Sequence, residues 1–183
     1  MFTTYTFDQA FSVEECDAII ALSKADPMED AGLVGGQSDH NYRRADLAWL
    51  DEREGTGWVM DRIIQVVAEC NRRVFDFDLR EFAESPQVAR YGAEREGHFT
   101  WHSDIGDGPV ARKRKLTMVV QLSEPDSYEG GVLEIWPDSH LRSAGRTRGA
   151  ATVFPSFMLH RVTPVTQGER YSLTIWAHGP AFR

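Results

Sequence analysis

The run Tyr171-Ser172-Leu173-Thr174-Ile175-Trp176-Ala177 has the composition of a β-strand, because β-branched and aromatic side chains make up most of it. It is the last of several short runs of this kind, which begin at residue 87 and are separated by turns rich in Gly and Pro. Short strands at this spacing are typical of a β-sandwich or an open barrel. We therefore predict strands at 87–92, 98–104, 116–122, 131–136, 150–154, 158–164 and 171–177.

Two helical patterns precede this β-rich part. Residues 12–24 open with a capping box, in which Ser12 is the N-cap and Glu15 its reciprocal partner. Residues 57–75 form the longer pattern, with an apolar stripe at helical spacing. We expect both helices to pack against the β-rich part.

Residues 28–41 are polar and rich in Gly, and we predict a loop there, without deciding whether it acts as a lid. Residues 42–50 have the mixed pattern of a strand. The predicted class is therefore α+β, in a single domain of residues 1–183. Within it we expect a helical support region at 1–78 and a β core at 79–183.

The composition is that of a globular protein, with 42% hydrophobic and 26% charged residues among 183. A net charge of −8 repels phosphate backbones, so nucleic acid is not an expected partner. We find no apolar run long enough for a membrane span. The two cysteines, Cys16 and Cys70, lie in helical patterns and predict free thiols in a cytoplasmic protein. The oligomeric state is not predicted.

The segment Thr100-Trp101-His102-Ser103-Asp104 combines an imidazole and a carboxylate at the end of a predicted strand. Side chains alternate between the faces of a strand, so His102 and Asp104 are expected to point the same way. By itself this spacing is weak, because a histidine near a turn is more often a hydrogen-bonded core residue.

A second imidazole, His160, lies on the predicted strand at 158–164. If this strand pairs antiparallel with the strand of His102, two imidazoles and the Asp104 carboxylate share one face. Such a facial triad suits non-haem Fe(II) and leaves positions open for substrates and O₂. Zinc is the poorer candidate, since it prefers four ligands and no cysteine is near in the sequence.

Arg170 opens the last strand, and Ser172 follows on the same face. A guanidinium matches a carboxylate through two parallel hydrogen bonds, and a buried arginine needs such a partner. We therefore predict that Arg170 and Ser172 clamp a carboxylate. A surface arginine after the turn at Gly168 is the alternative.

With these residues in place, the stretch from Arg90 to Trp176 resembles the 2-oxoglutarate- and Fe(II)-dependent oxygenases of the prolyl 4-hydroxylase type. The matching segments cover about half of the chain and occur in the order typical of the family. They are Arg90-Tyr91, His102-Ser103-Asp104, Lys115-Leu116-Thr117, Val119-Val120-Gln121-Leu122, Glu129-Gly130-Gly131, Phe154-Pro155-Ser156, 159–165 and Gly168-Glu169-Arg170-Tyr171.

The resemblance implies a double-stranded β-helix, or jelly roll, with Fe(II) as cofactor and 2-oxoglutarate and O₂ as co-substrates. It implies that His102, Asp104 and His160 are the metal ligands and catalytic residues. Arg170, Ser172 and Tyr91 would bind 2-oxoglutarate. The implied reaction is oxidative decarboxylation of 2-oxoglutarate to succinate and CO₂, coupled to hydroxylation of a C–H bond. The presence of Asp104 favours hydroxylation, because related halogenating enzymes carry a small residue in its place.

The implied substrate is a prolyl or other peptidyl side chain, and a free amino acid or small metabolite is the alternative. A non-enzymatic, cupin-like metal-binding barrel is the alternative of another class. His98 is a candidate for the substrate entrance, because regular alternation puts it on the face of His102. For Arg43-Arg44 and for the basic run Arg112-Lys113-Arg114-Lys115, solvated surface positions are the favoured interpretation.

Overall fold

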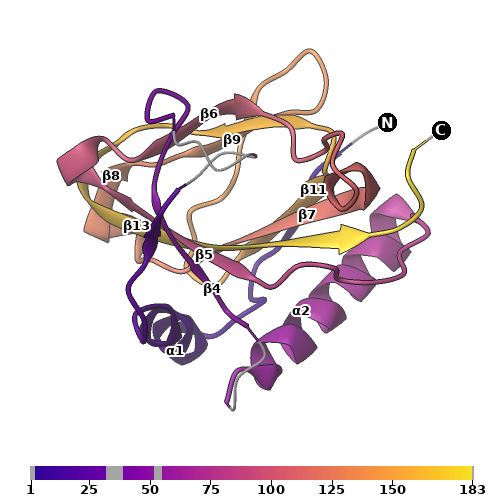
Figure 1. Ribbon diagram of the computed structural model, residues 1–183, viewed down its shortest axis with the longest axis horizontal. Coiled ribbons are helices and arrows are strands. Elements are labelled where there is room, and N and C mark those ends of the chain that lie inside the picture. The colour runs from indigo at the N-terminus through magenta and orange to yellow at the C-terminus, as the bar shows by residue number, and fades with distance from the viewer. Residues whose placement is uncertain (1–2, 32–38, 52–54, 183) are drawn as a thin grey trace.

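The computed structural model describes residues 3–31, 39–51 and 55–182. Two β-sheets face each other, and two helices cover the outer side of the larger sheet (Figure 1). The helices are α1 (Val13–Ser23) and α2 (Gly57–Cys70), and a π-helical turn, Asn71–Phe75, extends α2. Among the described residues, no helix is long and apolar enough to cross a membrane.

The larger sheet has the order β1-β11-β7-β13-β5-β4-β2, with β8 paired to β13, and the smaller sheet has the order β10-β9-β12-β6-β3. The strands are β1 (Tyr5–Phe7), β2 (Glu29–Asp30), β3 (Arg43–Arg44), β4 (Asp46–Trp49), β5 (Gln87–Gly92), β6 (His98–His102), β7 (Arg114–Gln121), β8 (Tyr128–Gly130), β9 (Leu133–Trp136), β10 (Arg142–Ser143), β11 (Ala151–Pro155), β12 (Leu159–Val162) and β13 (Val165–His178).

From β5 to β13 the chain passes repeatedly between the sheets: β5, β7, β11 and β13 lie in the larger sheet, and β6, β9, β10 and β12 in the smaller one. This alternation produces the jelly roll that the sequence predicts. Strand β13 is the centre of the larger sheet, because it pairs with both β5 and β7. Side chains on these central strands point alternately toward the helices and toward the smaller sheet.

The helix-facing side of the larger sheet forms one hydrophobic core. Met118 and Val120 of β7 pack there with Ile63 of α2 and Ile19 of α1, all completely buried. The opposite side forms a second core with the smaller sheet, to which Val119 contributes. Strand β7 therefore supplies apolar side chains to both faces, which explains its nearly continuous hydrophobic run.

Both predicted helices are confirmed, including the capping box of Ser12 and Glu15. The predicted strand at 42–50 is divided, because Arg43–Arg44 pair with β6 in the smaller sheet and Asp46–Trp49 with β5 in the larger one. The expected helical support region thus also supplies strands to both sheets. Short β1, which pairs with β11, is not predicted by the sequence.

The predicted loop at 28–41 is wrong at Glu29–Asp30, which pair with β4 as β2. Residues 32–38, half of the segment considered as a lid, lie outside the described residues. The last strand begins at Val165, six residues before the predicted start at 171, because its first residues pair with β8.

The contribution of the N-cap of α1 to the stability of the fold can be tested by mutation. Replacing Ser12 with Ala removes the hydrogen bond from the Glu15 backbone N–H to the Ser12 hydroxyl (3.1 Å). We expect the free energy of unfolding to fall by about 1 kcal/mol, measured by urea denaturation. Ser12→Asp is the control, because its carboxylate can also cap the helix. Equal losses in both variants would contradict the capping role.

Candidate active site

The two histidines predicted as ligands lie directly opposite each other on neighbouring strands. Strands β12 and β6 pair antiparallel with His160 opposite His102, as the sequence predicts. The ring centroids are 4.1 Å apart. A bulge follows, because Val162 pairs with Phe99 and β6 therefore holds one extra residue between the two pairs.

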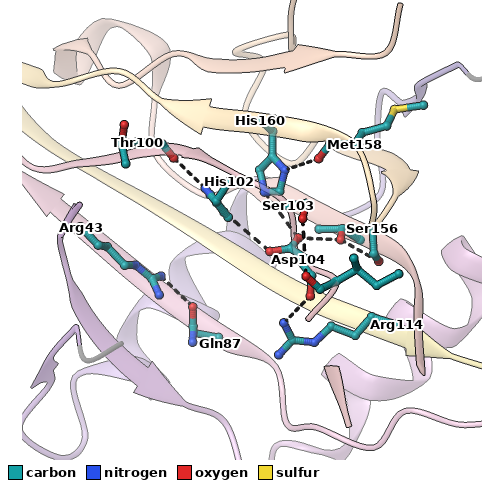
Figure 2. A network of polar contacts seen from close by, with 12 residues as sticks. Arg43, Gln87, Thr100, His102, Ser103, Asp104, Arg114, Ser156, Met158 and His160 are labelled. Carbon is teal, nitrogen blue, oxygen red and sulfur yellow. Dashed lines mark hydrogen bonds and ion pairs between the residues drawn. The ribbon is translucent and has the colours of Figure 1, made fainter. Parts of the chain in front are cut away.

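Both imidazoles are oriented by hydrogen bonds to backbone carbonyls. The Nδ1 atom of His102 lies 2.7 Å from the Thr100 carbonyl oxygen, and that of His160 lies 3.0 Å from the Met158 carbonyl oxygen. Nδ1 is the donor in each case, which leaves the Nε2 lone pair available to a metal. As Figure 2 shows, both rings face Asp104, with Nε2 to carboxylate oxygen distances of 3.6 Å for His102 and 3.4 Å for His160.

Asp104 follows the end of β6 and is held on three sides. Its backbone N–H donates to the Ser156 carbonyl (2.9 Å), and its carbonyl accepts from Arg114 Nη1 (3.0 Å). The Thr117 hydroxyl donates to Asp104 Oδ2 (2.7 Å). The remaining carboxylate oxygen is directed toward His102. These contacts fix the carboxylate without placing a cation in direct ion-pair contact with it.

The electrostatics of the site favour the protonation states that metal ligands need. Burial and the neighbouring His160 lower the pKa of His102 to about 4, so its imidazole is neutral at pH 7. Burial alone would raise the pKa of Asp104, but the two imidazoles and the Thr117 hydroxyl hold that pKa below its usual range. A neutral imidazole and an ionised carboxylate are therefore the resting forms.

The donor set fits a ferrous ion. One ligand atom from each of His102, Asp104 and His160 lies within 4.8 Å of the others, and all three side chains are at most 8% exposed. Two imidazoles and a carboxylate on one side, with the opposite side open to a cavity, are the arrangement of a facial non-haem iron site. Both cysteines are buried in the core on the helix side, which leaves thiolate out of this donor set.

Arg170 on β13 is completely buried and has no acidic partner among the described residues. Its Nε and Nη2 atoms donate to the side-chain oxygen of Gln121, whose amide nitrogen donates to the Tyr128 hydroxyl (2.8 Å). Its Nη1 atom is buried without a hydrogen bond. Burial lowers the pKa of Arg170, yet a guanidinium stays charged in proteins. A buried charge of this kind calls for an anionic ligand.

All six predicted site residues line one cavity between the two sheets. The metal triad borders it from the smaller sheet and the turn after β6, and the other three residues border it from β5 and β13. On β13, Arg170, Ser172, Thr174 and Trp176 alternate into this space. The predicted residues at the cavity are His102, Asp104, His160, Arg170, Ser172 and Tyr91.

The expectation that His98 borders the substrate entrance is wrong, and the bulge in β6 explains the error. The extra residue changes the alternation, so Phe99 rather than His98 lines the cavity, and Phe99 stacks on His102 with ring centroids 3.5 Å apart. The ring of His98 instead contacts the carbonyl oxygens of Glu96 and Asn41.

His178 has convergent partners that the sequence does not reveal. It is fully buried, and its Nδ1 accepts from the Ala83 backbone N–H, so Nε2 donates to Glu84 (3.0 Å). Glu84 also accepts from Arg114, whose guanidinium lies 4.0 Å from the Trp176 ring centroid. Arg114 is thus part of a network that supports the Asp104 turn, not a solvated member of the basic run.

Three functional residues escape sequence reasoning although each leaves a signal. Thr117 and Gln121 are polar residues in the apolar strand β7, and their spacing puts both on the side that faces the cavity. Thr117 donates a hydrogen bond to Asp104, and Gln121 accepts one from Arg170. Gly131 has a φ of +57°, and an added Cβ would lie 2.9 Å from Arg170 Cδ. This glycine therefore makes room for the Arg170 side chain.

The comparisons with known proteins agree with this geometry. The sequence profile of the 2OG-Fe(II) oxygenase superfamily matches residues 86–178, about half of the chain. The chain therefore belongs to the 2OG-Fe(II) oxygenase superfamily, whose members use Fe(II) and 2-oxoglutarate.

A PKHD-type hydroxylase of Hyphomonas neptunium is 30% identical over 153 residues, which are 81% of this chain and 66% of that protein. A second, from Delftia acidovorans, is 43% identical over 98 residues, which are 51% and 42% of the two chains. The chain thus spans two thirds or less of the length of these relatives.

Two solved structures have the same fold. A prolyl 4-hydroxylase of Pseudomonas putida superimposes with a TM-score of 0.78 at 20% identity, covering 98% of this chain and 94% of that one. A prolyl hydroxylase of Trichoplax adhaerens, in complex with a peptide of hypoxia inducible factor, gives a TM-score of 0.76 at 18% identity, covering 96% and 83%. These likenesses confirm the jelly roll.

The network behind Asp104 predicts a pH-dependent stability. Burial alone would raise the pKa of Glu84, but hydrogen bonds from His178 and Arg114 outweigh it and lower the pKa from 4.5 to about 2. Glu84 therefore stabilises the fold above pH 4.5, and this contribution is lost as the pH falls toward 2.

We expect Glu84→Gln to be less stable than the wild-type protein at pH 7 and the difference to shrink below pH 4.5, measured by chemical denaturation over a pH series. Glu81→Gln is the control, because that side chain is 55% exposed and 3.9 Å from Lys113. A difference for Glu84→Gln that is constant with pH would contradict the pairing.

Proposed function

We propose that this chain is an Fe(II)- and 2-oxoglutarate-dependent hydroxylase, with His102, Asp104 and His160 as its metal ligands. The observation that carries the proposal is the shared cavity, in which a metal triad and the uncompensated Arg170 face the same space. A metal-storage barrel gives no role to an arginine buried beside its metal site. The superfamily match supports the enzyme over that alternative.

Within this cavity the chain's own residues orient the co-substrate. Arg170 binds the distal carboxylate of 2-oxoglutarate, using the Nη1 atom that lacks a hydrogen bond. Ser172 is the next residue on the same face of β13, two positions after Arg170, and it offers its hydroxyl to that carboxylate. Tyr91 pairs with Arg170 across β5 and β13, and its ring centroid is 5.6 Å from the guanidinium carbon. We assign its hydroxyl to the same ligand.

Bound Fe(II), with 2-oxoglutarate and O₂, supplies the oxidative chemistry that yields succinate, CO₂ and a hydroxylated product. The protein contributes position and a nearly dry environment. Thr117 and the backbone of Ser156 hold Asp104, and the carbonyls of Thr100 and Met158 hold the imidazoles. Phe99 and Val162 exclude water from the ligand side of the cavity.

The proposed primary substrate is a prolyl or other peptidyl side chain. Support comes from the relatives, which are PKHD-type hydroxylases, and from the prolyl hydroxylases of the same fold, one of which is in complex with a peptide. The buried free thiols Cys16 and Cys70 support a cytoplasmic location. The test is succinate release, screened over peptides and free amino acids, with mass spectrometry to detect the product that has gained one oxygen atom.

Metal binding is tested separately from turnover. Replacing His160 with Ala removes one of the ligands, so we expect loss of the visible charge-transfer band that forms when Fe(II) and 2-oxoglutarate are added without oxygen. The control is His140→Ala, because that side chain is 84% exposed and does not line the cavity. A full band in His160→Ala would contradict the ligand assignment.

Co-substrate binding tests the role of Arg170. Arg170→Gln removes the cation, and a charge-assisted hydrogen bond is worth roughly 1.5–3 kcal/mol. We expect the 2-oxoglutarate concentration for half-maximal succinate release to rise by about 10- to 100-fold, with Fe(II) binding retained.

Arg161→Gln is the matched control, because Arg161 pairs with Glu134 on a different strand pair and does not line the cavity. Thermal unfolding checks that both variants fold. An unchanged 2-oxoglutarate requirement in a folded Arg170→Gln protein would contradict the clamp.

A further inference from the structure

A second arginine borders the same cavity and is not used by the proposed mechanism. Arg43 lies on β3, at the edge of the smaller sheet, opposite Phe99 of β6. Its side chain lines the cavity that His102 and Asp104 also line, and Figure 2 shows its guanidinium directed to Gln87. The guanidinium carbon is 4.4 Å from the centroid of the Phe99 ring, which in turn stacks on His102. Only one aromatic ring therefore separates this cation from a metal ligand.

Arg43 resembles Arg170 in its polar contacts, although its side chain is only partly buried. Its Nη2 atom donates to the amide oxygen of Gln87 (2.9 Å), just as Arg170 donates to Gln121. Its Nε atom is buried and has no hydrogen bond among the described residues. Neither guanidinium has an acidic partner there, whereas most described arginines pair with Asp or Glu. The buried Nε edge of Arg43 has no anionic partner among the described residues, and leaving it unpaired is costly unless a ligand provides the negative charge.

Two separate cations imply two separate anionic groups. Arg170 lies deep on β13 and is assigned to the distal carboxylate of 2-oxoglutarate. Arg43 approaches from the opposite sheet, beside the rings of Phe99 and Tyr42, which are in edge-to-face contact at 5.5 Å. Arg43 pairs with Phe99, which stacks on His102, and its partner Gln87 lies opposite Thr174, four residues along β13 from Arg170. The position suits the primary substrate rather than the co-substrate.

We propose that Arg43 is a specificity-determining residue that binds a carboxylate of the primary substrate, close to the C–H bond to be hydroxylated. The inference rests on the proposed function. The carboxylate belongs either to a free amino acid or to an acidic residue next to the target in a peptide. Both sources present the same planar anion to the Nε and Nη edge of the guanidinium.

The experiment compares matched acids and amides. Free L-amino acids are tested against their amides, and peptides with glutamate beside the target residue against the same peptides with glutamine. The protein is loaded with Fe(II) and saturating 2-oxoglutarate, so that Arg170 is occupied. Binding is measured by calorimetry without oxygen, and succinate release above the basal rate is measured with oxygen. The class of acid that responds identifies the source of the carboxylate.

We expect the acid to bind about 10- to 100-fold more tightly than its amide. In Arg43→Gln this preference should vanish, and Arg43→Lys should restore part of it, because lysine keeps the charge but not the planar fork. Arg44→Gln is the control, because this neighbour contacts Glu96 and the His40 carbonyl and does not line the cavity. Its preference should equal that of the wild-type protein.

The charge-transfer band with Fe(II) and 2-oxoglutarate separates this inference from the proposed function. A band in Arg43→Gln with unchanged 2-oxoglutarate affinity also shows that the variant folds. Equal responses to acid and amide in the wild-type protein, including no response to either, would overturn the role of Arg43 while leaving the band intact. A weaker 2-oxoglutarate affinity in Arg43→Gln would also overturn it, because Arg43 would then bind the co-substrate. Absence of the band from the wild-type protein would refute the proposed function itself.

Discussion

The pairing of β12 with β6, which sets His160 opposite His102, is the constraint on which the rest of the site depends. In a β-sheet, a slip of one residue turns every side chain of a strand to the other face. Such a slip would direct His160 to the outer surface and leave Asp104 beside a single imidazole. The bulge after this pair limits slippage, since it fixes Val162 against Phe99. It also places the Phe99 ring against His102, which keeps the ligand side of the cavity apolar.

A second constraint is the cost of buried charge. Arg170 and Arg43 each contact a glutamine oxygen instead of a carboxylate, and each retains a buried nitrogen without a hydrogen bond. An isolated core would not favour this arrangement, because an unpaired guanidinium opposes folding. In our proposal, the unpaired guanidinium groups lower stability but leave two positions ready to accept anions. The charged groups behind Asp104 are instead paired with one another, because Glu84 accepts hydrogen bonds from both Arg114 and His178.

Much of the fold and of the site follows from local pattern. Strand alternation and turn residues predict the core strands, and the capping box predicts the start of α1, because these signals depend only on neighbouring residues. The proposed ligand pair His102 and Asp104 can be predicted from the sequence for the same reason. What the sequence does not predict depends on distant contacts. The division of residues 42–50 between two sheets, the burial of His178 beside Glu84 and the space that Gly131 leaves for Arg170 all require the assembled fold. The error at His98 has one cause, a bulge that interrupts the alternation on which the prediction was based.

The central claim is that two imidazoles and one carboxylate hold a single ferrous ion at one side of the cavity. X-ray absorption spectroscopy at the iron edge, on the anaerobic protein loaded with Fe(II), measures this coordination directly. Our account predicts two imidazole ligands together with oxygen donors, one of which would be the Asp104 carboxylate. A spectrum with sulfur ligands, or with only one imidazole, would contradict it.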